Sequence, residues 1–424
     1  MKTGDSEAMA YGFDFGTSNS SIAVLRPGKN PELVPCGGNG VEASVLFFPG
    51  PTSKEFHVGK RALDEYLAAG RRGRFMQSLK SLLPHKSFTG TNLYGDWFDV
   101  EHIIALILRR LKEEADQAVG RLVNRVVLGR PVVFSEDKEE DNLAQRRLAE
   151  AAQLAGFDRV EFQYEPIAAA YSYERRLTRE ELVLVADLGA GTCDFTIVRL
   201  QPAANSARER SRDILGNAGV HVGGNDFDAA IMWHKLVPYF GYGAKYDAWG
   251  KWLDLPHSVF RNLCRWEWMA FLREGRVRED LDLFLRRSDS PERIARLIAL
   301  VDNDLGFGLF KAIEKAKIGL TEQEITSLDF HESKLDVHEL ITRNQFAGWI
   351  AEDIVAVENC VLGLLPKSGV KAVQIDSIFL TGGSSKVPAI RNVFDKAFGA
   401  EKIREGETFT SVALGLALLS EELL

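Results

Sequence analysis

Two short turns decide the fold of this 424-residue chain, Asp14-Phe15-Gly16-Thr17-Ser18-Asn19 and Asp187-Leu188-Gly189-Ala190-Gly191-Thr192. The first turn joins two β-prone runs at residues 11–15 and 20–25, and the second joins residues 182–187 to residues 193–200. Because the same strand-turn-strand unit occurs twice, we expect an internal duplication into two lobes of similar plan. Each lobe would then present one turn to a shared cleft.

The rest of the chain mixes strands and helices, which indicates an α/β protein. The predicted elements are, in chain order, a helix at 100–118, a strand at 125–128, a helix at 142–155, a strand at 377–381, a turn at Gly382-Gly383 and a helix at 388–398. Proline stands at the first position of the last helix, where a missing backbone N–H costs nothing.

We expect two domains, lobe I at residues 1–181 and lobe II at residues 182–424, because a single core stops growing at roughly 250 to 300 residues. Lobe I would carry an inserted subdomain at about 40–100, and lobe II an inserted helical subdomain at about 226–345. The polar residues 201–213 are predicted to form an exposed hairpin extension. Arginines and acids interleave in the second insertion, which favours a charged helical surface over an aromatic core rather than a nucleic-acid site. The expected core tryptophans are Trp233, Trp249, Trp252, Trp266 and Trp268.

Composition excludes several classes of protein. With 52 Lys and Arg against 60 Asp and Glu, the net charge of -8 disfavours a broad nucleic-acid footprint. The first residues are polar and acidic, unlike an export signal, and no apolar run approaches the roughly 18 residues that span a bilayer. We therefore expect a cytoplasmic protein without membrane contact. Its four cysteines lie far apart, which disfavours zinc and disulfides.

The two turns have the composition of a phosphate-binding site. Glycine permits close approach of backbone N–H groups and the positive φ of an anion-binding nest, which Gly16, Gly189 and Gly191 would supply. Further donors to phosphate oxygens are Thr17, Ser18, Asn19 and Thr192. Asp14 and Asp187 precede the turns, where a carboxylate would repel phosphate unless a cation lay between them. Mg²⁺ uses one or two carboxylates beside phosphates, so the pair predicts a magnesium nucleotide site.

These residues resemble the actin, hexokinase and Hsp70 superfamily of ATPases, and within it the Hsp70-like nucleotide-binding domain. Asp14-Phe15-Gly16-Thr17 is similar to the family's first phosphate loop, and residues 187–194 are similar to its second. Leu380-Thr381-Gly382-Gly383-Ser384-Ser385-Lys386-Val387-Pro388 is similar to its adenosine loop. Three further blocks follow the family order, Tyr164-Glu165-Pro166-Ile167-Ala168-Ala169-Ala170, Val222-Gly223-Gly224-Asn225-Asp226-Phe227-Asp228 and Glu314-Lys315-Ala316-Lys317.

The resemblance implies a two-lobed actin-like ATPase fold of duplicated ribonuclease H-like domains with two inserted subdomains. It implies that ATP or ADP binds with Mg²⁺, and that Asp14, Asp187 and Asp194 hold the ion through water. The residues implied to be catalytic are Lys80, Glu165, Asp187 and Thr192. Lys80 matches the family lysine that contacts the terminal phosphate and the attacking water, and Glu165 matches the glutamate near the metal and that lysine.

The resemblance also assigns the remaining nucleotide contacts. Besides the two turns, they are Gly223, Gly224, Glu314, Lys317, Ile318, Thr321, Gly382, Gly383, Ser384 and Lys386. Three positions depart from the family pattern. Ile318 stands where the common chaperones stack an arginine on adenine, Lys386 also replaces an arginine, and Ala190 replaces the middle glycine of the second loop. The Cβ of Ala190 requires a negative φ.

The implied function is slow hydrolysis of ATP by a chaperone-like protein whose lobe angle a partner protein reads. The chain ends at Leu424, where a full chaperone of this family would continue into a peptide-binding domain, so the resemblance is to short bacterial members of the YegD type. Two alternatives stay open. One is a nucleotide sensor or scaffold that does not hydrolyse ATP, and the other is a small-molecule kinase on the same fold.

Overall fold

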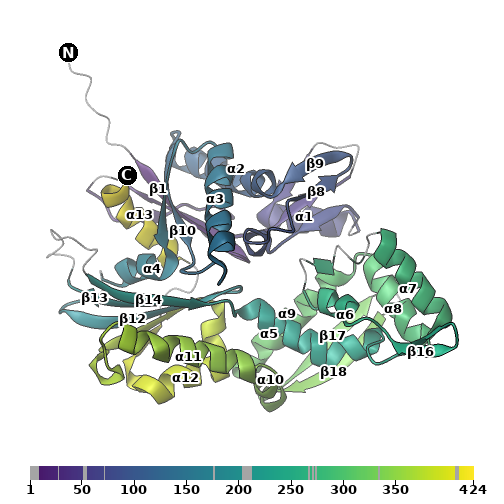
Figure 1. The fold of residues 1–424 in the computed structure, drawn as a ribbon. Coiled ribbons are helices and arrows are strands. Elements are labelled where there is room, and N and C mark those ends of the chain that lie inside the picture. The colour runs from purple at the N-terminus through teal and green to yellow at the C-terminus, as the bar shows by residue number, and fades with distance from the viewer. Residues whose placement is uncertain are drawn as a thin grey trace. The chain divides into compact units, whose positions relative to one another are not determined.

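The chain forms two compact units (Figure 1). The computed structural model describes residues 9–26, 28–50, 55–70, 72–174, 177–202, 213–265, 268–269, 272, 275–332, 335–405 and 410–424. The first unit comprises residues 1–67, 73–223 and 356–424, and the second comprises residues 68–72 and 224–355. Most of the predicted hairpin extension at 201–213 falls outside the described residues. The predicted domain boundary at residue 182 stays a prediction.

The first unit contains two mixed sheets of the same topology. In the first sheet the path of strands is β11 (Arg159–Tyr164), β10 (Arg125–Arg130), β1 (Ala10–Phe15), β2 (Asn19–Leu25) and β3 (Glu32–Leu33), with β4 (Glu42–Ala43) paired to β2. In the second sheet the path is β20 (Ile403–Glu405), β19 (Ser377–Thr381), β12 (Glu181–Leu188), β13 (Cys193–Leu200) and β14 (Ile214–Val220).

The pairing directions repeat as well. In each sheet the first strand in sequence is antiparallel to the second and parallel to a strand from much later in the chain, as β1 is to β2 and β10, and as β12 is to β13 and β19. The predicted duplication of a strand-turn-strand unit is therefore confirmed. The chain is an α/β protein with two mixed sheets, as predicted.

Helices cover both sheets of the first unit. They are α2 (Val100–Val119), α3 (Lys138–Leu154), α4 (Glu165–Glu174), α12 (Pro388–Phe398) and α13 (Ser411–Leu423), together with the end of α11 (Ala351–Lys367). α3 begins earlier than predicted because the side chain of Asp137 caps it, accepting from the backbone of Glu139 and Glu140 at 2.9 and 3.0 Å. The prediction missed this cap.

The C-terminal helix α13 returns to the first sheet and packs on β1 and α4. Two glycines allow this approach. A Cβ on Gly12 of β1 would lie 2.1 Å from the backbone of Ala417, and one on Gly415 would lie 1.7 Å from the carbonyl of Ala168. No larger residue fits at either position, so helix and sheet lie in backbone contact.

Smaller elements fill the segment predicted as the insertion of lobe I. They are β5 (Leu46–Phe48), β6 (His57–Val58), α1 (Gly59–Ala68), β7 (Arg74–Met76), the 3₁₀ turn η1 (Leu79–Leu82), β8 (Gly90–Leu93) and β9 (Asp96–Asp99). β5 pairs with both β6 and β7, and β8 forms a hairpin with β9. The chain leaves this segment directly into α2.

The second unit contains more than helices. Its helical elements are α5 (Gly224–Ile231), η4 (Met232–Leu236), η5 (Val237–Phe240), α6 (His257–Leu263), α7 (Gly275–Arg287), α8 (Pro291–Asp302), α9 (Gly306–Glu322), α10 (Arg343–Trp349) and the start of α11. Two hairpins, β15 (Lys245–Ala248) with β16 (Lys251–Asp254) and β17 (Ile325–Glu332) with β18 (Leu335–Thr342), correct the expectation of a helical insertion. The aromatic-core prediction is also wrong for Trp249 and Trp252, whose side chains are 90% and 57% exposed. Among the helices that the structure describes, none is long and apolar enough to cross a membrane.

Candidate nucleotide site

The two predicted phosphate turns lie next to each other within the first unit. A Cβ on Gly191 in the second turn would lie 3.3 Å from the Oγ1 of Thr17 in the first turn. The strand register places Asp14 opposite Ser21, and it places Asp187 between Asp194 and Thr381. The duplicated strands thus bring both predicted aspartates and both turns to one place.

The turns use glycine for close approach rather than for positive φ. A Cβ on Gly16 would lie 2.2 Å from the carbonyl oxygen of Asn19, so only glycine fits there. Neither Gly16, Gly189 nor Gly191 has a positive φ, which corrects the expectation of such a conformation. Ala190 has no positive φ either, so the backbone accommodates its Cβ without strain. The N–H of Gly189 donates to the carbonyl of Thr192 at 2.9 Å and closes the second turn.

A buried ion pair lies at the centre of the site. The Nζ of Lys80 is 2.6 Å from an Oε of Glu165, and both residues are only 8% exposed. Lys80 belongs to η1, which begins after the left-handed Ser78, and Glu165 is the first residue of α4. Burial opposes the charge on Lys80, but the carboxylates of Glu165 and Asp14 outweigh it and raise the pKa of the lysine. The ammonium group is therefore held charged.

Three aspartates share this charge environment. Burial and the charge of Glu165 raise the pKa of Asp14 well above its usual range. For the same two reasons, the pKa of Asp187 rises to about 8 and that of Asp194 rises to about 7. Four carboxyl groups surround one lysine, and burial together with their mutual repulsion raises the pKa values of the three aspartates. A cation bound between these groups would favour their ionised form.

The carboxyl groups of this site suit a magnesium ion that is held through its water ligands. Within the described part of the chain, no three histidine, cysteine or carboxylate side chains converge closely enough to coordinate an ion directly. Mg²⁺ keeps several of its waters and needs only one or two carboxylates beside phosphate oxygens. The aspartates at the ends of β1 and β12 therefore suit this ion when it arrives with a nucleotide.

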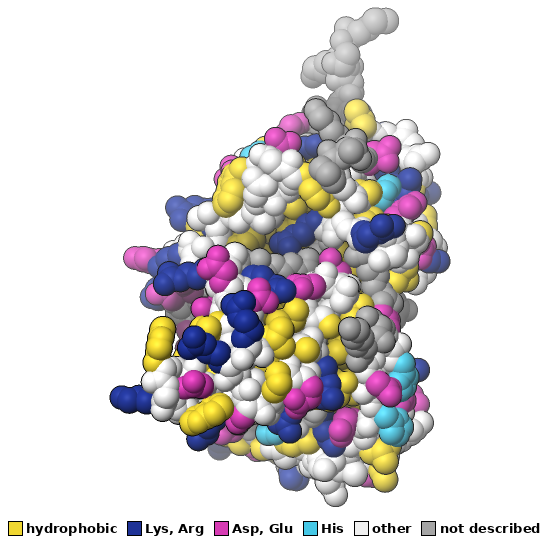
Figure 2. Space-filling model, turned by 90° about the vertical axis from the view of Figure 1, so that its right-hand side faces the viewer, with side chains coloured by type: hydrophobic (Ala, Val, Ile, Leu, Met, Phe, Trp, Pro, Cys, Tyr) yellow, Lys and Arg dark blue, Asp and Glu magenta, His cyan; other side chains and the backbone are white. Residues whose placement is uncertain are grey.

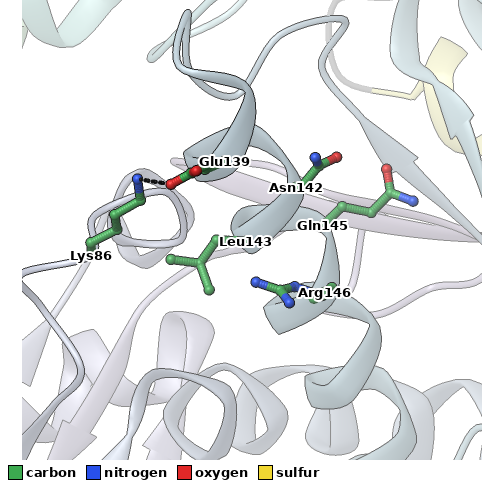
Figure 3. Close-up of a pocket in the computed structure, with 6 residues that line it drawn as sticks. All are labelled: Lys86, Glu139, Asn142, Leu143, Gln145 and Arg146. Carbon is green, nitrogen blue, oxygen red and sulfur yellow. Dashed lines mark hydrogen bonds and ion pairs between the residues drawn. The ribbon is translucent and has the colours of Figure 1, made fainter.

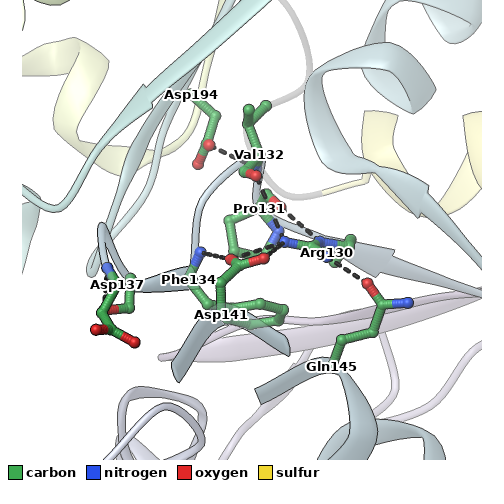
Figure 4. Close-up of polar contacts among 9 residues, drawn as sticks. Arg130, Pro131, Val132, Phe134, Asp137, Asp141, Gln145 and Asp194 are labelled. Carbon is green, nitrogen blue, oxygen red and sulfur yellow. Dashed lines mark hydrogen bonds and ion pairs between the residues drawn. The ribbon is translucent and has the colours of Figure 1, made fainter. Parts of the chain in front are cut away.

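Asp194 is fixed by a polar network that the sequence did not reveal (Figure 4). The backbone N–H of Val132 donates to an Oδ of Asp194 at 2.7 Å. The preceding Arg130 holds this segment, because its guanidinium donates to both Oδ atoms of Asp141 at 2.9 Å, to Gln145 and to the carbonyl of Pro131 at 3.0 Å. The sequence feature that could have indicated this network is Arg130 itself, which precedes Pro131 at the end of the predicted strand at 125–128.

The predicted adenosine loop packs on the second predicted phosphate turn. Gly382 has a φ of +81°, and a Cβ there would lie 2.2 Å from the carbonyl of Leu188. The hydroxyl of Ser384 donates to the carbonyl of Gly189 at 2.8 Å. Gly223, directly before α5, approaches the same turn, since a Cβ there would lie 2.5 Å from the carbonyl of Ala190. Gly383 and Lys386 are exposed.

The predicted adenine residues of α9 belong to the second unit and have partners there. Lys317 donates to Asp228 at 2.8 Å and to the carbonyl of Gly224 at 3.1 Å. Burial raises the pKa of Asp228 to about 6, although Lys317 acts in the opposite direction. The remaining members are Glu314, which accepts from Lys311 at 2.6 Å, Thr321, which donates to the carbonyl of Ile318 at 2.7 Å, and Ile318 itself, which is 57% exposed.

A surface pocket of about 640 Å³ lies apart from these residues, on α3 (Figure 3). It is lined by Lys86, Glu139, Asn142, Leu143, Gln145 and Arg146. None of the predicted site residues lines it. Lys86 is paired with Glu139 at 2.8 Å across its edge.

Comparison with known proteins places the chain in a family. The family model described as Hsp70 protein matches residues 10–248 and 302–423. A "Chaperone protein DnaK" of Thermus thermophilus is 28% identical over 97% of this chain and 60% of its own length. A protein of the same name from Thermosipho melanesiensis is 27% identical over 96% of this chain and 58% of its own length. The "Heat shock 70 kDa protein, mitochondrial" of Solanum tuberosum is 26% identical over 96% of this chain and 54% of its own length. The chain thus spans little more than half the length of these relatives.

Proposed function

Because the chain belongs to the Hsp70 family, we propose that it binds Mg-ATP and slowly hydrolyses it to ADP and phosphate. The observation that carries the proposal is the buried pair of Lys80 and Glu165, 2.6 Å apart among three aspartates and beside the two turns. An isolated buried ion pair seldom stabilises a fold enough to explain its presence. A charged lysine facing a phosphate site has a direct chemical use.

The proposed roles follow from charge and position. The turns would bind phosphate oxygens through backbone N–H groups and through their hydroxyl and amide side chains, which are Thr17, Ser18, Asn19 and Thr192. Lys80 would offset charge on the transferred phosphoryl group and orient the attacking water, and Glu165 would keep the ammonium in place. Asp14, Asp187 and Asp194 would hold Mg²⁺ through water, and the ion would neutralise phosphate charge.

On the nucleoside side we propose contacts from Gly224, Glu314, Lys317, Ile318, Thr321, Gly383, Ser384 and Lys386. The exposed side chain of Ile318 supports this, because an isoleucine that is 57% exposed is available for apolar contact with a base. Lys317 would act from its pair with Asp228, which fixes its position on α9.

Two of the three relatives are named chaperones, and we propose a chaperone-like role in which a partner protein responds to the bound nucleotide. Activity of a whole chaperone is part of this proposal, since the chain matches only 60% of the first relative's length. The finer resemblance to the YegD type and the cytoplasmic location remain predictions.

Single-turnover hydrolysis of radiolabelled ATP tests the proposal, with and without Mg²⁺, in the native protein and in Lys80→Ala and Asp14→Asn. We expect slow release of phosphate that needs Mg²⁺ and that both substitutions nearly abolish. Lys86→Ala serves as the control, because Lys86 is a half-exposed surface lysine with ion pairs of its own. ATP binding without hydrolysis would support the alternative of a nucleotide sensor or scaffold. Phosphorylation of an added sugar or acid would support the alternative of a small-molecule kinase.

A further inference from the structure

Basic side chains at the surface of this chain differ in their surroundings from those in its interior. On the face that Figure 2 shows, Lys and Arg lie among Asp, Glu and hydrophobic side chains, so the charges there are mixed in sign. Arg278 of α7, for example, lies 2.9 Å from Asp302 at the end of α8. Such surface pairs contribute little on their own. Arg147 of α3 is different, because its side chain is only 7% exposed.

The guanidinium of Arg147 binds one short stretch of backbone. Four carbonyls accept from it, those of Leu82 at 3.5 Å, Leu83 at 3.0 Å, His85 at 3.1 Å and Phe88 at 3.1 Å. Its Nε lies 3.2 Å from a carboxylate oxygen of Glu101 in α2, so the buried charge is paired. A guanidinium presents five N–H groups in one plane, which lets a single side chain bind several carbonyls at once.

This stretch directly follows Lys80. Lys80 belongs to the 3₁₀ turn η1, and the N–H of Leu83 donates to the carbonyl of Lys80 at 3.2 Å. The turn also lies beside the second predicted phosphate turn, since a Cβ on Gly191 would lie 3.9 Å from the Oγ of Ser81. A short 3₁₀ turn has poor hydrogen-bond geometry and little stability of its own. The position of Lys80 therefore depends on what holds the backbone on either side of it.

The backbone before Lys80 is strained. Ser78 has a φ of 56°, in the left-handed region that residues with a Cβ seldom adopt, and it is buried. Such a conformation persists only where the surrounding structure holds it. The buried side chains of Leu79 and Leu82 and the hydrogen bonds of Arg147 lie directly after this residue. The leucines and the arginine therefore keep a strained turn in one place.

We propose that Arg147 is a positioning residue, which holds the segment after Lys80 so that the ammonium group stays beside Glu165 and the two turns. The inference rests on the proposed function, in which Lys80 faces the transferred phosphoryl group. Arg147 acts through the backbone of residues 82–88 rather than by contact with nucleotide, because its guanidinium is occupied by carbonyls and by Glu101. Without these bonds the segment is free to move, and Lys80 leaves the site.

Chemical labelling of Lys80 tests its position without any need for ATP hydrolysis. The native protein, Arg147→Gln and Arg146→Gln are treated with an N-hydroxysuccinimide ester of acetic acid, and mass spectrometry follows each lysine. We expect Lys80 to react about fivefold faster or more in Arg147→Gln, because local opening exposes it. Lys112 is the internal reference, since it is also buried and pairs with Asp116 at 2.6 Å, and its rate should stay native. Arg146→Gln, at the exposed neighbouring position of α3, should change neither rate.

Single-turnover hydrolysis and ATP affinity supply the second readout. At saturating Mg-ATP, Arg147→Gln should hydrolyse about tenfold more slowly because its lysine is misplaced, while its ATP affinity should stay within about twofold of native. Adding Arg147→Gln to Lys80→Ala should lower the rate no further, since the lysine that it positions is already gone. Arg147→Lys keeps a charge beside Glu101 but lacks the planar fork, so it should show smaller changes in the same directions.

Two results would overturn the inference. They are native labelling of Lys80 in a folded Arg147→Gln protein, and a further loss of rate when Arg147→Gln is added to Lys80→Ala. If Arg147→Gln unfolds, which faster labelling of Lys112 and thermal unfolding would reveal, Arg147→Lys decides in its place, and native labelling of Lys80 there would overturn the inference. A native protein that does not hydrolyse ATP would contradict the proposed function alone, because the labelling still decides whether Arg147 positions Lys80.

Discussion

The predicted phosphate residues and the predicted adenine residues differ in what holds them. On the phosphate side, the buried pair of Lys80 and Glu165 lies beside turns whose glycines meet other backbone atoms. On the adenine side, Lys317 pairs with Asp228 within its own unit while Ile318 is 57% exposed. A site built from buried charge and backbone contact tolerates few substitutions. An exposed helical face tolerates many, so the departure at Ile318 falls where change costs least.

Removing the buried lysine should have the largest effect. Lys80→Ala deletes the cation that is paired with Glu165 in this cluster of carboxylates, and we expect single-turnover hydrolysis to fall by about 10² to 10³-fold, as for loss of a charge-stabilising group. The measurement is phosphate release at saturating ATP. Lys86→Ala should retain the native rate, and a Lys80→Ala protein that hydrolyses normally would remove this lysine from the mechanism.

Neutralising an aspartate should act on the magnesium requirement. Asp187→Asn removes one of the charges proposed to hold the hydrated ion, and we expect the Mg²⁺ concentration for half-maximal hydrolysis to rise about tenfold or more. A titration of rate against Mg²⁺ measures this. Asp96→Asn, at an exposed aspartate of β9, is the matched control. Identical Mg²⁺ curves for Asp187→Asn and the native protein would contradict the assignment.

Crowding the second turn should weaken nucleotide binding without removing a charge. In Gly223→Ala the new Cβ would lie 2.5 Å from the carbonyl of Ala190, so the turn must shift. We expect Mg-ATP affinity to fall between about 5-fold and about 150-fold, since overpacking typically costs ~1–3 kcal/mol and each ~1.4 kcal/mol is tenfold. Gly363→Ala adds the same atom on α11 where nothing lies within 4 Å, and it should bind as the native protein does. Equal affinities of the two variants would show that the turn does not contact the nucleotide.

A substitution among the predicted adenine residues should have the smallest effect, and it should raise ATP affinity rather than lower it. Ile318→Arg would place a guanidinium where the family stacks one on the base, and we expect ATP affinity to rise about two- to fivefold, from a cation–π gain of ~0.5–1 kcal/mol. Ile325→Arg is the matched control, because Ile325 is 55% exposed in the same unit. An equal gain in both variants would reflect added positive charge alone.

The sequence predicted local elements well because their signals are local. The β-prone runs on either side of each turn became β1 with β2 and β12 with β13, and the strand at 377–381 became β19. β17 and β18 were missed although Leu328 and Phe330 alternate with exposed residues, because a helical reading of the whole insertion overrode that pattern.

Contacts between distant residues could not be read from spacing. Lys80 and Glu165 are separated by 85 positions, so only the resemblance to the family suggested that they meet. Nothing in the sequence indicated that Val132 would donate to Asp194, or that α13 would return to the first sheet. Trp249 and Trp252 are exposed although tryptophan is usually buried, and spacing alone does not show that no other element covers their side chains.

Calorimetric titration of ATP into the native protein, in Mg²⁺ and then in EDTA, tests the central claim most directly. If the aspartates beside the two turns hold magnesium between the protein and the phosphates, binding should saturate at one site in Mg²⁺ and weaken at least tenfold in EDTA. The same affinity in both buffers, or no binding in either, would contradict the account.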